Sequence, residues 1–180
     1  MGRYSIFHDD HEIRGATIIP YRDSINSQNY LDIYTKHGLG TINPDAWYPM
    51  QNLVDVFNDI QASGNAVMDF VSIGMKMSEN LPLPPEMANS SFIEMVRNVD
   101  QAYQYSNRGS DYGYIRGVIT SERHVTVHYR VPYPDDLLYG SLYGYAKRFL
   151  PVGTSFTVAF DIKTIRMEQG GTETVIHVKW

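Results

Sequence analysis

Apolar side chains recur every three or four positions through the first hundred residues, which is the period of an amphipathic helix. Capping residues and glycine or proline breaks divide this stretch into segments of ordinary helix length. The first segment has a cap in Asn26 or Ser27. The pattern predicts helices over 26–36, 45–62, 65–77 and 91–103.

Local signals mark where two of these helices begin. Asp45 and Pro49 are alternative start markers for the second helix, because Asp caps free amides and Pro suits the first turn. Glu94 follows Ser91 by three residues, which is the spacing of a capping box. In the helix over 65–77, the period predicts one buried stripe made of Val67, Phe70, Val71 and Met75.

Beyond Gly109 the period changes from helical to alternating. From Val125 to Val131 apolar residues alternate with polar ones, which predicts a strand with one buried and one polar face. Asp135 or Asp136 starts one helix between two predicted hairpins. Near the N-terminus, a short strand is predicted to end before Pro20. The predicted strands are 16–19, 112–120, 123–131, 157–167 and 173–180, and the helix is 136–150.

This order of elements predicts an α+β fold, with N-terminal helices packed on an antiparallel sheet of two hairpins and one intervening helix. The 180 residues are enough for one core. Residues 1–25 are predicted to form an N-terminal arm or short strand, and residues 26–180 a single ligand-binding-like domain.

The composition excludes several classes of site. The chain has no cysteine, so it has no disulfide, zinc–thiolate site or cysteine nucleophile. Its net charge of −5 argues against nucleic acid as a partner. No apolar run is long enough for a membrane span, and no secretion signal is present, so a cytoplasmic location is expected.

Histidine-rich segments offer little for a metal ion. His8, Asp9, Asp10 and His11 are expected to form an exposed polar arm. His124 and His128 share a strand face about 13 Å apart, too far to chelate one ion, and His177 could approach only one of them. No metal site is therefore predicted, and no catalytic motif supports an enzyme.

The helix from Asp136 is the most informative candidate for a binding site. Gly140 and Gly144 allow a close approach to a neighbour, for which packing on the sheet is expected. The alternative is a space over the helix in which a ligand sits, because tyrosine provides an apolar wall with a polar tip. The predicted ligand-binding residues are Phe70, Tyr139, Leu142, Tyr143 and Tyr145.

The C-terminal third resembles a known superfamily. The run Tyr133-Pro134-Asp135-Asp136, the segment Gly144-Tyr145-Ala146-Lys147-Arg148-Phe149 and the ending Gly170-Gly171 with 175–180 resemble the ligand-binding domains of nitric-oxide signalling and Golgi transport. That superfamily includes 4-vinyl-reductase-like domains, haem–nitric-oxide-binding domains and subunits of a vesicle-tethering complex. The resemblance implies this fold and a sensory or binding role.

The chain also departs from these domains. Relatives often carry cysteine where this chain has Asp135, Ile165 and Thr174, so thiol chemistry is not carried over. The haem-binding branch is marked by a helix histidine and a Tyr-x-Ser-x-Arg motif. No histidine lies between His37 and His124, and the segment 103–108 has those residue types at another spacing. The resemblance is therefore taken to imply no cofactor, with haem disfavoured.

Three functions follow, in this order. The first is a bacterial sensory domain for a small hydrophobic or amphipathic ligand, acting in signal transduction as a homodimer with an output domain or partner protein. The second is a protein-interaction or scaffold module with a closed core. The third is a haem-based sensor of nitric oxide.

Overall fold

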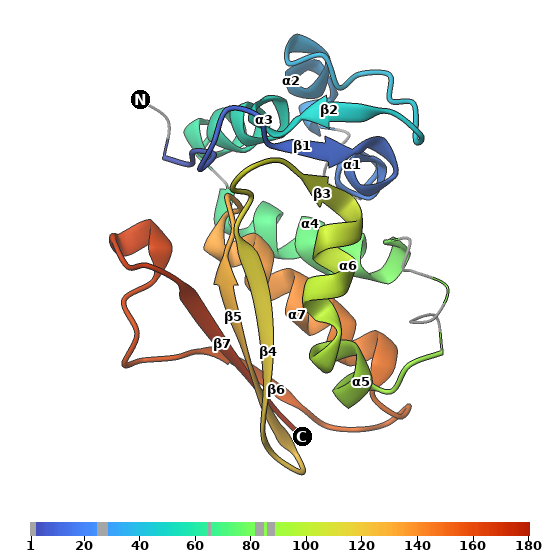
Figure 1. Cartoon of the computed structure of the whole chain (residues 1–180), viewed down its shortest axis with the longest axis vertical. Helices are drawn as coiled ribbons and strands as arrows, with labels where there is room; N and C mark the ends of the chain where they lie inside the picture. Colours follow the sequence, from blue (N-terminus) through green and yellow to red (C-terminus); the bar gives the residue numbers. More distant parts are fainter. Residues whose placement is uncertain (1–2, 25–28, 65, 82–84, 86–88) are drawn as a thin grey trace.

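The computed structural model describes residues 3–24, 29–64, 66–81, 85 and 89–180. It shows the predicted α+β fold, with helices and two antiparallel sheets (Figure 1). Within these residues, no helix has the length and apolar character needed to cross a membrane. The cap predicted at Asn26 or Ser27 lies outside the described residues.

A small three-stranded sheet holds the N-terminal part together. Its strands lie antiparallel in the order β2 (Trp47–Pro49), β1 (Glu12–Arg14), β3 (Asn107–Arg108). It is accompanied by α1 (Gly15–Arg22), α2 (Leu31–Lys36) and α3 (Met50–Ala62), which form the upper layer in Figure 1. Residues 3–24 thus contribute to the core, since Ile13 and Ile18 are completely buried.

The strand predicted at 16–19 is wrong, because these residues belong to α1 with Pro20 inside it. The amides of Gly15 and Ala16 donate to the carbonyls of Ala46 and Pro44, so the first turn is satisfied by a loop distant in sequence. The burial of Thr17, Ile18 and Tyr21 then follows one helical side. Tertiary contacts therefore override the local strand signal.

The buried side of helix α4 (Ala66–Asn80) is made of other residues than the predicted stripe. Phe70 is buried as expected, but Val67 is 56% exposed, and Gly74 lies on the buried side with Ile73 and Met77.

The start of α3 after Pro49 is confirmed. The helix predicted over 91–103 is divided at Asn98 into α5 (Phe92–Arg97) and α6 (Val99–Ser106). Its capping box is confirmed.

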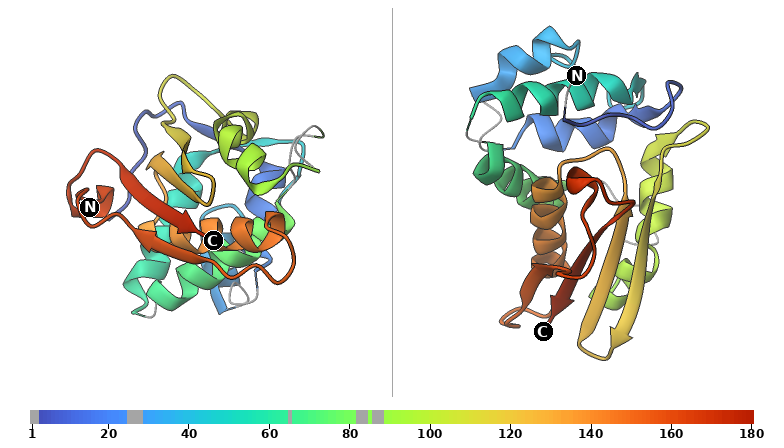
Figure 2. Two further views of the ribbon diagram at one scale, coloured as in Figure 1. Left: turned by 90° about the horizontal axis from the view of Figure 1, so that it is seen from below. Right: turned by 90° about the vertical axis from the view of Figure 1, so that its left-hand side faces the viewer.

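The larger sheet has four antiparallel strands, and α5, α6 and α7 lie on one side of it (Figures 1 and 2). The strand order is β4 (Tyr114–Ser121), β5 (His124–Arg130), β7 (Thr174–Lys179), β6 (Thr157–Phe160). Val125, Val127 and Tyr129 are buried, as the alternation predicts. The strand predicted over 157–167 is too long, because β6 ends at Phe160 and the connection includes the short 3-10 helix η3 (Met167–Gln169).

Glycines allow α7 (Asp135–Phe149) to pack closely on α4. A Cβ atom at Gly140 would lie 2.2 Å from the carbonyl oxygen of Val71, and one at Gly74 would lie 2.2 Å from that of Leu137. The expectation that Gly140 and Gly144 pack on the sheet is therefore wrong, since both face α4. The sequence pattern identified a close contact but not its partner.

Replacing Gly140 with Ala should lower the free energy of unfolding by about 1–3 kcal/mol, because the new methyl group would overlap the Val71 carbonyl. The direction of the change tests the packing, because Gly→Ala in a helix with free space around the glycine raises the free energy of unfolding by roughly 0.5–1 kcal/mol. Urea unfolding of Gly140→Ala measures the change, with Lys147→Ala on an exposed part of α7 as control. A stabilised Gly140→Ala variant would contradict this packing.

Candidate functional site

A partly open cavity of about 70 Å³ lies between the helices and the larger sheet. Side chains from α1, α4, α6, α7, β4 and β5 form its wall. Both the N-terminal part of the chain and the larger sheet with its helices therefore contribute to it. The wall consists of Thr17, Tyr21, Met77, Leu81, Val99, Ala102, Tyr103, Ser106, Ile115, Tyr129, Tyr133, Leu137, Leu138, Ser141 and Tyr145.

Five of these residues are tyrosines, and they come from different parts of the chain. Burial raises the pKa of all five phenols, that of Tyr145 to about 12. The phenols therefore stay protonated at neutral pH, and Thr17, Ser106 and Ser141 add further hydroxyl groups to the wall. The hydroxyl of Tyr103 donates to the carbonyl of Tyr112 over 2.5 Å, and the ring of Tyr21 stacks on that of Tyr133.

Among the residues predicted to bind a ligand, the structure brings Tyr145 to this cavity. Phe70 lies in the core with its ring 5.9 Å from that of Phe57, and Leu142 is buried in α7. The other two pack toward the segment that contains β6: Tyr139 lies 5.5 Å from Phe160 and Tyr143 lies 4.9 Å from Phe156, ring to ring.

Sequence reasoning missed most of the cavity wall. The contributions of α1 and α6 could not be found from spacing, because they depend on how the two layers meet. One signal was available: Tyr129 is on the buried face of an alternating strand, and Tyr103 is on the apolar stripe of a helix. Tyrosine at such positions needs a polar environment for its hydroxyl.

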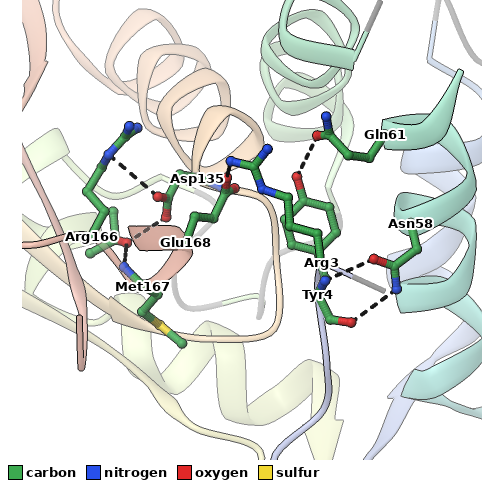
Figure 3. Close-up of polar contacts among 9 residues, drawn as sticks. Arg3, Tyr4, Asn58, Gln61, Asp135, Arg166, Met167 and Glu168 are labelled. Atoms are coloured by element: carbon green, nitrogen blue, oxygen red, sulfur yellow. Dashed lines mark hydrogen bonds and ion pairs between the residues drawn. The ribbon is translucent and has the colours of Figure 1, made fainter. Parts of the chain in front are cut away.

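A cluster of charged and polar side chains, separate from the cavity, surrounds the beginning of α7 (Figure 3). Asp135 is 1% exposed; its Oδ1 accepts a hydrogen bond from Thr174 over 2.5 Å, and its Oδ2 is 3.7 Å from Arg166 Nε. The backbone amide of Asp135 donates to Glu168 over 2.6 Å, and Glu168 in turn pairs with Arg3. Carboxylates of η3 and α7 thus converge on two arginines.

This cluster occupies the positions where the superfamily resemblance implies cysteine. The structure brings two of the three, Asp135 and Thr174, into direct contact, whereas Ile165 is 64% exposed. A carboxylate and a hydroxyl therefore make a hydrogen bond at the place of two thiols.

The first residues behave differently from the expected arm: His8, Asp9 and Asp10 are exposed, but His11 is completely buried and its Nε2 lies 2.9 Å from Asn107 Oδ1.

The fold matches solved structures of H-NOX domains. An H-NOX protein from S. oneidensis in the Fe(II)NO ligation state has a TM-score of 0.67 and 12% identity, with 93% of this chain and 98% of that chain covered. An oxygen-bound H-NOX domain related to soluble guanylate cyclases has a TM-score of 0.65 and 15% identity, with 92% and 91% covered.

A structure from a study of haem distortion in the H-NOX family has a TM-score of 0.67 and 13% identity, with 92% of both chains covered. No family model matches the sequence, and no curated protein matches it either. At these identities the comparison shows the fold, and the fold predicted from the resemblance is confirmed.

The expectation that no cofactor is involved is wrong. It is contradicted by these matches, because the solved structures concern haem distortion and haem redox potential, and include an oxygen complex. The absence of a histidine between His37 and His124 does not exclude haem, because haem iron also takes Tyr or Met ligands. Haem is the group that these solved structures with the same fold concern.

The residues in the cavity wall do not fit haem in this conformation. A cavity of about 70 Å³ is much smaller than the roughly 300 Å³ at which ligand pockets begin. The wall has no histidine among its described residues, and its possible iron ligands are Met77 and the phenols. Burial raises the pKa of each phenol, which opposes a phenolate ligand. Haem would require the wall to move.

The stability of the protein should depend on pH through Asp135. Burial is the main cause that raises its pKa to about 6, from 3.8. Between these two values the folded state binds the proton more tightly than the unfolded state, so this group's contribution to stability falls as the pH rises from 4 to 6. Asn keeps an acceptor for Thr174 but has no charge to bury.

The variant Asp135→Asn should therefore lack this contribution. The free energy of unfolding of Asp135→Asn minus that of wild type should increase by about 1–2 kcal/mol when the pH rises from 4 to 7. Urea unfolding at a series of pH values measures the difference, with Asp9→Asn in an exposed segment as control. A difference between wild type and Asp135→Asn that does not change with pH would show that Asp135 has an ordinary pKa.

Proposed function

We propose that this chain is a ligand-binding sensor domain and that the tyrosine-lined cavity is its ligand site. The observation that carries the proposal is the convergence of five buried phenols, from both layers of the fold, on one cavity. The hydroxyl of Tyr103 already has a protein acceptor in the carbonyl of Tyr112, so the proposal rests on the shared space that the five rings line. The solved structures with this fold support a binding role, since they include complexes with nitric oxide and oxygen.

The guest that fits the cavity as it stands has only a few non-hydrogen atoms. A benzene-binding cavity measures about 150 Å³, roughly twice the volume found here. A larger hydrophobic or amphipathic ligand binds only if the wall opens, and Met77 provides an adaptable part of that wall. Of the ligand-binding residues predicted from the sequence, Tyr145 is the one this proposal keeps.

Haem is the second candidate, and the fold shared with haem-carrying H-NOX domains favours it. It requires a larger change in the wall than a small guest does. The scaffold alternative is not favoured, because the solved structures with this fold bind small molecules. The homodimer, the signalling output and the lack of enzymatic activity belong to the same proposal as predictions.

A substitution that fills the cavity should increase the stability of the protein and weaken ligand binding. Ala102 on α6 lines the cavity, and Ala102→Leu places three more carbon atoms there. At roughly 24 cal/mol per Å³ of cavity removed, the variant should be more stable by about 1–2 kcal/mol. It should also bind a cavity ligand at least about tenfold more weakly, because binding and filling compete for one space.

Urea unfolding measures the stability, and native mass spectrometry after gentle purification measures the bound mass. Gln104→Ala, on the exposed side of the same helix, is the matched control. If Ala102→Leu and wild type retain the same bound mass equally, the ligand lies elsewhere.

Haemin is the first ligand to add, because the solved structures with this fold concern haem. Haem in this cavity should give a Soret band in wild type and in Gln104→Ala, and a much weaker band in Ala102→Leu. Equal bands in all three proteins would place haem outside the cavity. A wild-type protein without a band would remove haem as the ligand while leaving the small-guest proposal to the mass measurement.

A further inference from the structure

Two histidines on neighbouring strands face each other on the polar side of the larger sheet. His124 Nε2 lies 2.9 Å from His177 Nδ1, and the two rings stack with their centroids 5.1 Å apart. His177 pairs with Thr126, so His124 on β5 is its diagonal neighbour. His128 is too far from His124 along the strand to share an ion, whereas His177, expected to approach only one of the two, lies beside His124 through the strand pairing.

A carboxylate fixes which nitrogen of His177 faces His124. Asp161 Oδ1 lies 3.1 Å from His177 Nε2, and its Oδ2 accepts a hydrogen bond from Thr164 over 2.6 Å. A carboxylate only accepts, so His177 carries its proton on Nε2 and its lone pair on Nδ1. That lone pair points at His124. Metal-binding histidines usually donate their second nitrogen to a carboxylate in this way.

We propose that His124 Nε2 and His177 Nδ1 form a two-histidine site for a divalent transition metal, with a preference for Cu²⁺. In the metal-free protein His124 donates its Nε2 proton to His177 Nδ1. When that proton moves to Nδ1 of the same neutral ring, the lone pair of His124 Nε2 joins that of His177. Two nitrogen ligands then converge without a net loss of protons.

The distance between the two nitrogens sets the choice of metal. With metal–nitrogen bonds of roughly 2.0–2.1 Å, a separation of 2.9 Å corresponds to an angle of about 90° at a metal that lies to one side of the line between the nitrogens, so both rings must turn from their hydrogen-bonded orientation to coordinate it. That angle belongs to square-planar or tetragonal coordination, which Cu²⁺ and Ni²⁺ adopt, rather than to the tetrahedral geometry of Zn²⁺. Cu²⁺ also has the highest affinity for nitrogen ligands among these ions.

The surroundings leave room for further ligands. A surface groove of about 350 Å³ borders His177 and is lined by Asp161, Ile162 and Lys179 among others. Water, or a donor from a bound molecule, can complete the coordination there. Lys179 pairs with His124 across the strands, so its charge opposes a cation, and its removal should strengthen binding.

The test is a titration of tag-free full-length protein with Cu²⁺, followed by electron paramagnetic resonance. One equivalent should bind with hyperfine structure from two nitrogens. His124→Ala and His177→Ala should each weaken binding at least about tenfold and remove the two-nitrogen signal. Asp161→Asn should weaken it by roughly 10–100-fold, the usual effect of losing a carboxylate that orients a ligand. Lys179→Gln should strengthen binding.

The matched control is His128→Ala, which removes a histidine from the same face of the same strand, where it pairs with Glu173. It should leave the affinity and the spectrum unchanged, and Zn²⁺ should bind wild type at least about tenfold more weakly than Cu²⁺. Circular dichroism checks that each variant is folded. The proposal is overturned if wild type gives no saturable copper signal, or if His124→Ala and His177→Ala, both folded, keep the wild-type signal.

Discussion

The contact between α4 and α7 is the constraint on which the rest of the structure depends. Gly74 and Gly140 let the two helix backbones meet with no side chain between them. At this distance Ser78 can donate a hydrogen bond across the contact to the carbonyl of Ser141, over 2.7 Å. The position of α7 is thereby fixed from one side. Tyr145 then reaches the cavity, while Tyr139 packs against Phe160 near the sheet.

Five of the fifteen residues in the cavity wall carry rigid rings, and these rings help to keep the space open. Tyr133 stacks on Tyr21 and contacts Phe57 edge-on, and all three are buried. Such rings cannot collapse into a space of this size as aliphatic chains can. Since burial raises the pKa of the phenols, the wall stays neutral and donates hydrogen bonds. For the proposed ligand site, a neutral lining favours neutral or weakly polar guests over charged ones.

The fold could be predicted further than the site, and the reason lies in which interactions are local. The capping box of Ser91 and Glu94 and the alternation along β5 depend on neighbours in sequence, so both were found. The helical form of 15–22 depends on carbonyls near residue 45, and the register of α4 depends on α7. The tyrosine wall and the His124–His177 pair come from elements far apart in the chain. Neither can be found from one sequence without the strand pairing.

The strand pairing between β5 and β7 links the interior of the molecule to its outer face. Side chains alternate along β5, so Tyr129 enters the cavity while His124 points outward. The register that pairs Thr126 with His177 also pairs Tyr129 with Thr174. Thr174 in turn holds Asp135 at the start of α7. A slip of one residue would exchange the two faces and separate both contacts. Asp135 and Thr174 therefore connect the start of α7 to β7, three residues from His177.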